Sequence, residues 1–483
     1  MLVINKYRGE TRMVNIKKIL IPVSFFVFLV MMTGTASAVD WSVNPGDSIQ
    51  STIDGASDND TIIVNDDNGT SYTYTENVVV NKRLTVMSSS ENVVVHALNS
   101  NDGVFTINNI GSGSTIRGFN INGGKDGIII NSANNCYIIG NIITNNSRDG
   151  IHATGVNLTI INNALTGNGG SGIYQNGNNA TITNNIATNN NVNGIEAHSN
   201  NAIITPDNII HDNRGNGLTI INGDNITLNG FNIYNNGGIG IFATGNNLTI
   251  TNNIITGNGV DGIQHQGINT IITNNIATNN GASGIYTKYN DNAIITGNTA
   301  TNNRGNGLTI IKGSQVQIEE NTAQQNGGIG IFATGNNLTI TGNIAEDNLI
   351  GISVDGDNEV NNNECRLNVG SGMVVTGTNT VSENTIEYNG ANGLIATGFN
   401  EIDDNDIEYN VGNGISAVGE NIITDNDINS NMGNGVLTSG VNIIDGNDIC
   451  YNDLYGIYIG GGVPIIGSNK LYGNVKGPIG PTP

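Results

Sequence analysis

Two short segments, 23 residues apart, combine basic, acidic and imidazole side chains. Each segment places a basic residue and then an aspartate directly before a glycine: Lys125-Asp126-Gly127 and Arg148-Asp149-Gly150-Ile151-His152. Two carboxylates held close together can raise the pKa of one of them and so divide the roles of acid and base. If the fold stacks the two segments, these residues could cleave a polysaccharide by acid–base chemistry.

The same residues also fit a purely structural interpretation. Aspartate before glycine is ordinary turn chemistry, and Lys125 and Arg148 could be solvated ion-pair partners of the two carboxylates. His152 lies two residues after its glycine, and the equivalent positions of the next two segments hold Tyr174 and Glu196. Catalysis therefore requires that these side chains share one outer face, which depends on how the chain repeats.

A glycine followed by an aliphatic residue recurs along most of the chain. The sixteen steps from the first to the last of these glycines span 353 residues, and each of the last six steps is 21 residues. The glycines are Gly103, Gly127, Gly150, Gly172, Gly194, Gly217, Gly240, Gly262, Gly284, Gly307, Gly330, Gly351, Gly372, Gly393, Gly414, Gly435 and Gly456. Asparagine stands four residues before the next glycine in 14 steps and nine residues before it in 13.

Between the asparagines, short segments such as Leu158-Thr159-Ile160 alternate with a period of two, which is typical of strands. A repeat of 21 to 24 residues built only from short strands predicts an all-β fold, a single-stranded right-handed parallel β-helix of about 17 or more coils. The right-handed choice follows the preference of parallel crossovers. Asparagine tolerates the left-handed backbone of a tight turn, and its amides can hydrogen-bond from coil to coil.

The chain divides into four predicted regions. Residues 1–38 are predicted to be a signal peptide, with an uncleaved anchor as the alternative, because Lys17 and Lys18 precede an apolar run that ends before the small residues Ala36-Ser37-Ala38. Met1 or Met13 could be the start. Residues 39–100 hold an N-terminal cap and the first coils, with a short helix capped by Asp47 or Ser48. Residues 101–470 are the repeats, and residues 471–483 are a Gly/Pro-rich tail.

Composition narrows the classes of function. The chain has 90 Asn and 67 Gly among its 483 residues, but only 12% charged and 5% aromatic residues. Without residues 1–38 it has 12 basic and 39 acidic residues, a formal charge of −27. We expect no nucleic-acid partner, because such a chain repels phosphate backbones. We also expect no membrane anchor after signal cleavage, and therefore a secreted or cell-surface protein.

The opening Pro45-Gly46-Asp47-Ser48-Ile49-Gln50, the segment Glu76-Asn77-Val78-Val79-Val80-Asn81-Lys82 and the glycine and asparagine repeats together resemble the pectate-lyase-like parallel β-helix superfamily. The likeness is greatest to the NosD-type repeat proteins that archaea and bacteria export to the cell surface. It covers about residues 40 to 475. The superfamily includes polysaccharide lyases, hydrolases, epimerases, adhesins and structural proteins, so it implies a fold more than an activity.

Aromatic residues recur two positions after the repeated glycine. They are Tyr174, Phe242, Tyr286, Phe332 and Tyr458, and polar residues stand between them. Flat rings along a rod suit stacking against sugar rings, although such rings could also merely cover the shaft. We therefore expect a structural or adhesive protein that binds carbohydrate or a cell-surface polymer. The alternative is a polysaccharide lyase, glycoside hydrolase or epimerase that uses Asp126, Asp149, His152, Arg148, Lys125 and Glu196.

Two further patterns concern ions and modification. Acidic residues crowd the last coils, where successive carboxylates could hold Ca²⁺ or could form a solvated face: Asp403, Asp404, Asp406, Glu408, Asp425, Asp427, Asp445 and Asp448. No other cofactor and no dedicated metal site is expected. Asn-x-Ser/Thr sequons, which permit glycosylation of an exported chain, begin at Asn59, Asn68, Asn145, Asn157, Asn179, Asn225, Asn247 and Asn337.

Overall fold

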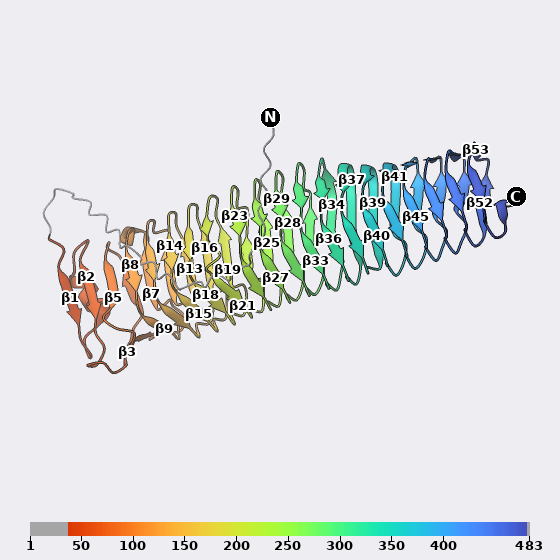
Figure 1. Cartoon of the computed structure of the whole chain (residues 1–483). Helices are drawn as coiled ribbons and strands as arrows, with labels where there is room; N and C mark the ends of the chain where they lie inside the picture. The colour runs from red at the N-terminus through yellow and green to blue at the C-terminus, as the bar shows by residue number, and fades with distance from the viewer. Residues whose placement is uncertain (1–36, 481–483) are drawn as a thin grey trace, which may run out of the picture. The chain divides into compact units, whose positions relative to one another are not determined.

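The computed structural model describes residues 37–480. They form a right-handed parallel β-solenoid of about 20 turns, which confirms the predicted fold class (Figure 1). The predicted signal peptide lies outside the described residues, except for its last two positions. Within 37–480, no helix is both long and apolar enough to cross a membrane.

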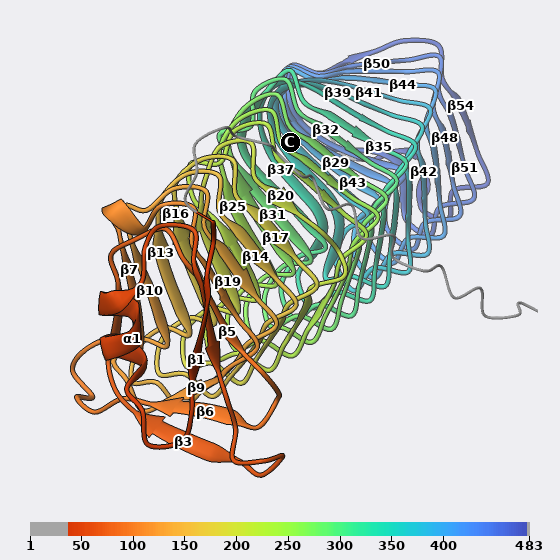
Figure 2. The same cartoon turned by 90° about the vertical axis from the view of Figure 1, so that its left-hand side faces the viewer.

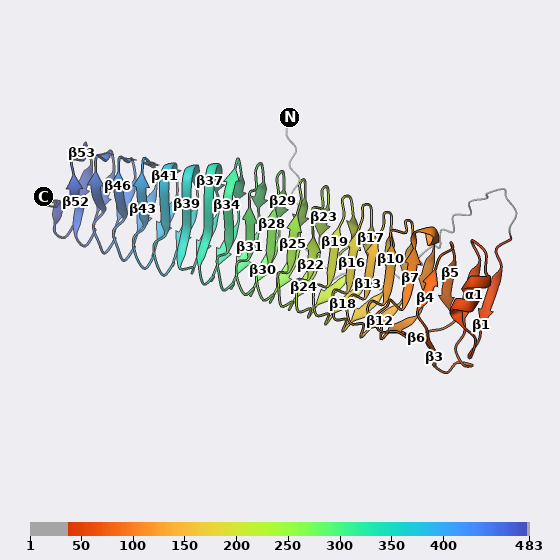
Figure 3. The same ribbon diagram turned by 180° about the vertical axis from the view of Figure 1, so that it is seen from behind.

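Each coil contributes a strand to up to three parallel sheets, which we call faces 1, 2 and 3 (Figure 3). Face 1 consists of β4 (Val78–Val80), β7 (Phe105–Asn108), β10 (Ile128–Asn131), β13 (Ile151–Thr154), β16 (Ile173–Asn176), β19 (Ile195–His198), β22 (Leu218–Ile220), β25 (Ile241–Thr244), β28 (Ile263–Gln266), β31 (Ile285–Lys288), β34 (Leu308–Ser314), β43 (Leu394–Gly398), β46 (Ile415–Gly419), β49 (Val436–Gly440), β52 (Tyr455–Gly462) and β55 (Gly477–Ile479). Three long strands bend from face 1 onto face 2: β37 (Ile329–Thr341), β39 (Ile350–Asn361) and β41 (Met373–Ser382).

Face 2 consists of β1 (Asp40–Val43), β2 (Thr61–Val64), β5 (Thr85–Ser88), β8 (Thr115–Arg117), β11 (Tyr137–Ile139), β14 (Thr159–Ile161), β17 (Thr181–Thr183), β20 (Ile203–Ile204), β23 (Thr227–Asn229), β26 (Thr249–Thr251), β29 (Ile271–Thr273), β32 (Ile294–Thr296), β35 (Gln317–Glu319), β44 (Glu401–Asp403), β47 (Ile422–Thr424), β50 (Ile443–Asp445) and β53 (Ile465–Ile466).

Face 3 consists of β3 (Tyr72–Thr75), β6 (Val93–His96), β9 (Asn120–Asn122), β12 (Ile142–Thr144), β15 (Ala164–Thr166), β18 (Ile186–Thr188), β21 (Ile209–His211), β24 (Asn232–Tyr234), β27 (Ile254–Thr256), β30 (Ile276–Thr278), β33 (Thr299–Thr301), β36 (Thr322–Gln324), β38 (Ile344–Glu346), β40 (Glu364–Arg366), β42 (Thr385–Glu387), β45 (Asp406–Glu408), β48 (Asp427–Asn429), β51 (Asp448–Cys450) and β54 (Lys470–Tyr472). A single 3₁₀ turn, η1 (Asn109–Gly111), follows β7.

The core is a continuous file of aliphatic side chains inside the coils. In β13, for example, Ile151 and Ala153 are buried while His152 and Thr154 point outward. Register then stacks like positions, because Ile151 pairs with Ile173 of the next coil and His152 pairs with Tyr174. The period-two pattern of the sequence therefore decides which side chains enter the core and which reach solvent.

The glycine and asparagine columns of the sequence have one common cause. A Cβ at Gly330 would lie 2.6 Å from the carbonyl oxygen of Gly351 and 2.7 Å from Nδ2 of Asn348. The repeated glycine therefore leaves room for the asparagine of the following coil. Buried asparagines form two files, four and nine residues before the repeated glycines, in which most side-chain oxygens accept from the backbone N–H and the side-chain amide of the asparagine one coil earlier, as Asn280 accepts from Asn258.

The left-handed turns are made by different residues from those that form these files. Asn184 has φ of 52° and Asn274 has φ of 55°, and each directly precedes a buried asparagine, Asn185 or Asn275, that has no positive φ. From the sequence, we had expected the same asparagine to make the left-handed turn and to hydrogen-bond from coil to coil. Two neighbouring residues divide these roles, because the side chain at the left-handed turn faces solvent and the side chain in the hydrogen-bonded file faces the interior.

Helix α1 (Ile49–Gly55) lies at the N-terminal end of the solenoid (Figure 2). Ser48 is its N-cap and accepts from the backbone N–H of Ser51. Ile49 and Ile53 are buried against the first coil. The Gln50 side chain accepts from the N–H of Val79 at 2.7 Å and donates to the same residue's carbonyl, so it replaces a neighbouring strand at the edge of β4. This arrangement blocks edge pairing there.

Candidate functional site

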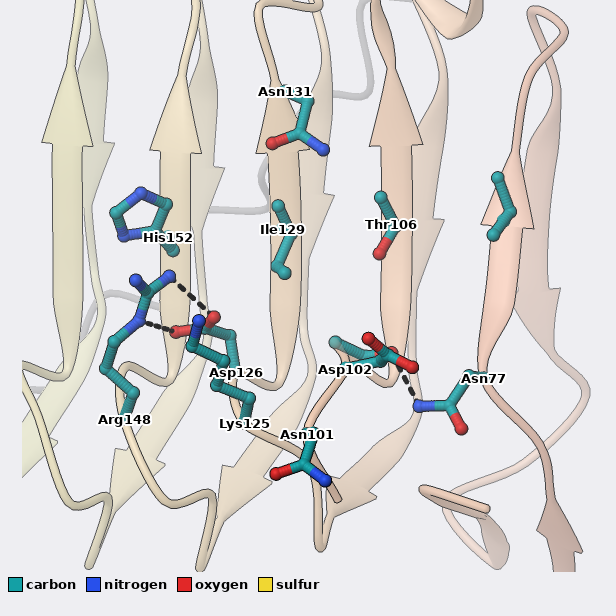
Figure 4. Close-up of a pocket in the computed structure, with 12 residues that line it drawn as sticks. Asn77, Asn101, Asp102, Thr106, Lys125, Asp126, Ile129, Asn131, Arg148 and His152 are labelled. Carbon is teal, nitrogen blue, oxygen red and sulfur yellow. Dashed lines mark hydrogen bonds and ion pairs between the residues drawn. The ribbon is translucent and has the colours of Figure 1, made fainter. Parts of the chain in front are cut away.

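A groove of about 540 Å³ crosses the first coils of face 1 (Figure 4). It is lined by residues of four successive coils, and its charged and polar lining includes Asp102, Thr106, Lys125, Asp126, Arg148 and His152. Five of the six residues named as catalytic candidates are thus gathered or adjacent here: Lys125, Asp126, Arg148 and His152 line the groove, and Asp149 contacts two of them. Glu196 lies two coils away on β19.

Arg148 holds the carboxylate of Asp126 with two hydrogen bonds. Nε and Nη2 of Arg148 donate to the two carboxylate oxygens at 2.7 and 2.6 Å. The Asp126 side chain is fully buried and also accepts from the backbone N–H of Asp149. The hydrogen bond with Asp126 raises the pKa of the Arg148 guanidinium. Through these contacts Asp126 holds the Arg148 side chain in place.

Asp149 orients His152 at the edge of the groove. One carboxylate oxygen of Asp149 lies 2.9 Å from Nδ1 of His152, and the other accepts from the backbone N–H of Ser171. The imidazole stacks on the ring of Tyr174 in the next coil, with ring centres 4.7 Å apart and planes 3° apart. An imidazole held by a carboxylate is a common general acid or base, and this one remains partly exposed.

The position before the repeated glycine has a structural task in many coils. Asp126, Asp149 and Asp261 each accept a backbone N–H from the next coil. Asn193 and Asn216 fill the same position elsewhere and do the same. Burial raises the pKa of the Asp261 carboxyl, which has no cationic partner within the described range. These contacts support the interpretation of the aspartates as turn residues, and the catalytic role of Asp126, Asp149, His152, Arg148, Lys125 and Glu196 stays a prediction.

The aromatic candidates form one outward column on face 1. Register places each of them on the same file as His152 and Glu196, and all five rings are half-buried: Tyr174, Phe242, Tyr286, Phe332 and Tyr458. Beside Tyr174, His198 packs at a ring distance of 5.2 Å and bonds the Glu196 carboxylate at 2.8 Å. From Tyr174 to Phe332, polar residues stand between the rings of this file, whereas the aliphatic residues Val374, Ile395 and Leu437 occupy it between Phe332 and Tyr458.

The acidic candidates of the last coils do not form one site. The carboxylates of Asp406, Glu408 and Asp427 lie within 4.8 Å of one another on face 3. Burial first, and then the neighbouring like charges, raise the pKa of both Asp406 and Glu408. The others lie apart: Asp448 pairs with Lys470, Asp403 accepts from Thr424, Asp445 accepts from Ser468, and Asp404 and Asp425 occupy left-handed turns. Ca²⁺ at the first three remains a prediction.

The sequence interpretation missed a second aromatic column, directly after the strands of face 3. Tyr388 and Tyr409 are half exposed and stack with ring centres 5.0 Å apart, and Tyr451 occupies the same position two coils later. All three have a left-handed backbone. Their spacing in multiples of 21 residues, each five before a repeated glycine, was available in the sequence.

Comparisons with solved structures return proteins of low identity. The Dettilon tailspike protein is 17% identical over 66% of this chain, which covers 65% of the tailspike's length, with a TM-score of 0.36. The A-module of a mannuronan C-5 epimerase of Azotobacter vinelandii is 15% identical, with 90% of this chain and 95% of the module covered and a TM-score of 0.22. A mannuronic acid specific polysaccharide family 6 lyase from human gut microbiota is 11% identical over 65% of this chain and 86% of the lyase, with a TM-score of 0.37.

No curated protein matches the sequence. A family model described as a right handed beta helix region matches residues 102–248, 216–364 and 265–400. These ranges together run from residue 102 to residue 400, which is more than half of the chain. This match confirms the predicted superfamily, and the chain belongs to the right-handed β-helix family.

Proposed function

We propose that this protein is an exported β-helix, secreted or held at the cell surface, whose face 1 binds carbohydrate in a structural or adhesive role. One observation carries the proposal. Five rings occupy a single outward column, and register keeps them in line across the length of the solenoid. Aromatic faces in a row, with hydrogen-bonding side chains between them, can contact the apolar faces and the hydroxyls of successive sugars.

The middle of the column points to a neutral glycan. Phe242, Tyr286 and Phe332 are each two coils apart, about 9.6 Å at the usual strand spacing, and Gln264 and Thr309 stand between them. None of these five outward side chains is charged. The strongly acidic chain as a whole repels polyanions. An extended neutral polysaccharide, which presents the same sugar face at alternate units, would meet one ring at every second unit.

Alanine at Phe242 or Phe332 is expected to weaken glycan binding about tenfold, because the loss of one stacked ring costs about 1.4 kcal/mol. Binding would be measured by retention on a panel of neutral and acidic polysaccharides, followed by titration of the best ligand. The matched control is Tyr137→Ala, which removes an exposed ring from face 2. Equal affinities for wild type, both face 1 variants and the control would refute this binding face.

A second candidate function is polysaccharide cleavage or epimerisation in the groove. The observation that favours it is the His152 imidazole, which Asp149 orients and which shares the groove with the exposed Lys125. In this function His152 would exchange the proton at the reacting carbon or oxygen. Lys125 would bind an anionic group of the sugar, and Asp126 would hold Arg148 in place.

The same polysaccharide panel tests this second function when new reducing ends and unsaturated ends are scored. The expected result is product formation by wild type that is lost in His152→Gln. The control is His211→Gln, because His211 also pairs with an aspartate, Asp212, but lies on face 3. Product formation that survives in His152→Gln, or that disappears equally in His211→Gln, would exclude the groove as the active site.

A further inference from the structure

The eight sequons occupy one kind of structural position. The asparagine of every sequon is exposed and has a left-handed backbone, with φ between 49° and 73°. None of the buried asparagines starts a sequon, because the residue two positions after each of them is neither serine nor threonine. The asparagines of the buried files are therefore different residues from the sequon asparagines, which are exposed to a modifying enzyme.

Five of these sequons lie on one edge of the solenoid, at the turn between face 1 and face 2, which we call the sequon edge. Their asparagines are Asn157, Asn179, Asn225, Asn247 and Asn337. In each, the next residue is buried and the threonine after it begins the face 2 segment with its side chain turned outward. Register confirms the alignment, since Thr159 pairs with Thr181 and Thr227 pairs with Thr249.

Four of the five side-chain amides of this edge, those of Asn157, Asn179, Asn225 and Asn247, take part in an outer file of hydrogen bonds between coils. Nδ2 of Asn179 donates to Oδ1 of Asn157 at 3.1 Å, and Nδ2 of Asn247 donates to Oδ1 of Asn225 at 3.2 Å. A primary amide has two N–H groups, so attachment of a sugar to Nδ2 leaves one to keep this bond. Modification here is compatible with the folded coil, whereas at a buried file both N–H groups are used, as in Asn275.

We propose that the sequon edge carries N-linked glycans on the exported chain, an inference that rests on the proposed export. The Nδ2 atom of asparagine would attack the anomeric carbon of a lipid-phosphate-linked oligosaccharide. The N–C bond forms, the bond between the anomeric carbon and the phosphate oxygen breaks, the lipid phosphate leaves with the electron pair, and the amide loses one proton. The glycans would stand beside the aromatic column of face 1 and leave its rings uncovered.

The test is glycopeptide mapping by mass spectrometry of the chain recovered from the organism that encodes it. Sugar is expected on peptides that contain the five asparagines of the sequon edge. Asn135, Asn201 and Asn269 provide an internal control, because they have the same φ and lie in the same outer file but lack the hydroxyl residue of a sequon. They are expected to be unmodified.

Threonine variants keep the asparagine file intact and supply the second control. Alanine at Thr159, Thr181, Thr227, Thr249 and Thr339 is expected to remove the glycan mass, and serine at the same positions is expected to retain it. Unmodified edge peptides in a chain found outside the cell would overturn this inference and leave the proposed export standing. A chain found only inside the cell and unmodified would overturn both. Sugar confined to Asn59, Asn68 or Asn145 would also overturn the assignment to this edge.

Discussion

Replacing Asn275 with alanine is expected to destabilise the solenoid by about 4 kcal/mol. Nδ2 of Asn275 donates to the carbonyl of Ile250 at 2.8 Å and to Oδ1 of Asn298 at 2.9 Å, and its Oδ1 accepts two donors from Asn253. Alanine leaves two donors and at least one acceptor without these partners inside the protein. Each orphaned group costs about 1 to 3 kcal/mol.

The measurement is guanidinium unfolding followed by circular dichroism, together with amide hydrogen exchange resolved by coil. Coils contact only their neighbours, so the loss of protection should be greatest in the two coils on either side of Asn275. The matched control is Asn176→Ala, an exposed asparagine of face 1 whose side chain bonds no other described residue. It should change stability by less than about 0.5 kcal/mol. Equal effects of the two variants would show that the buried file does not stabilise the fold.

The fold could be predicted from the sequence because one pattern repeats with little change. The glycine at Gly150 and the asparagine at Asn168 recur together, since a side chain at the first would meet the amide of the second. Such a coupling leaves a regular period in the sequence, and together with the short strand segments this period predicts a β-solenoid. The different roles of Asn184, which makes a left-handed turn, and Asn185, which lies in the buried file, were not predicted. Both residues are asparagine, and only the backbone conformation distinguishes them.

The candidate site was only partly predictable. Register followed from the repeat, so the alignment of His152, Tyr174 and Glu196 could be inferred from counting. The bidentate contact of Arg148 with Asp126 could not, because it depends on the direction of a long side chain. The same holds for the acidic coils, where Asp406 faces outward on a strand while Asp404, two positions earlier, makes a turn.

Stability is expected to fall as the pH is lowered, because one histidine is enclosed in the core. His265 is fully buried in the inner file of face 1, between Ala243 and Thr287. Its Nδ1 lies 3.1 Å from the carbonyl of Ala243 and its Nε2 lies 2.7 Å from the Thr270 hydroxyl. Burial lowers the pKa of His265 from 6.5 to about 4. At a pH between these two values, the imidazole is protonated in the unfolded chain and neutral in the folded protein.

The sign of the effect follows from this lowered pKa. Above pH 6.5 the imidazole is neutral in both states and its contribution is fully present. Between pH 6.5 and pH 4 only the unfolded chain gains the proton, and about 3 kcal/mol of stability is lost, at about 1.4 kcal/mol for each pH unit. Below pH 4 the folded protein is protonated as well, and the loss from this group stops.

The variant His265→Gln isolates this effect from the carboxylates that titrate in the same range. Glutamine suits the position, because Gln175 is buried at the equivalent place four coils earlier. Unfolding midpoints would be measured at pH 7, 5.5 and 4 for wild type, His265→Gln and the exposed-side control His211→Gln. The free energy of unfolding should fall by the same amount in wild type and the control between pH 7 and pH 4. In His265→Gln it should fall by about 3 kcal/mol less. Parallel curves for all three proteins would mean that His265 accepts its proton inside the folded solenoid as readily as in the unfolded chain.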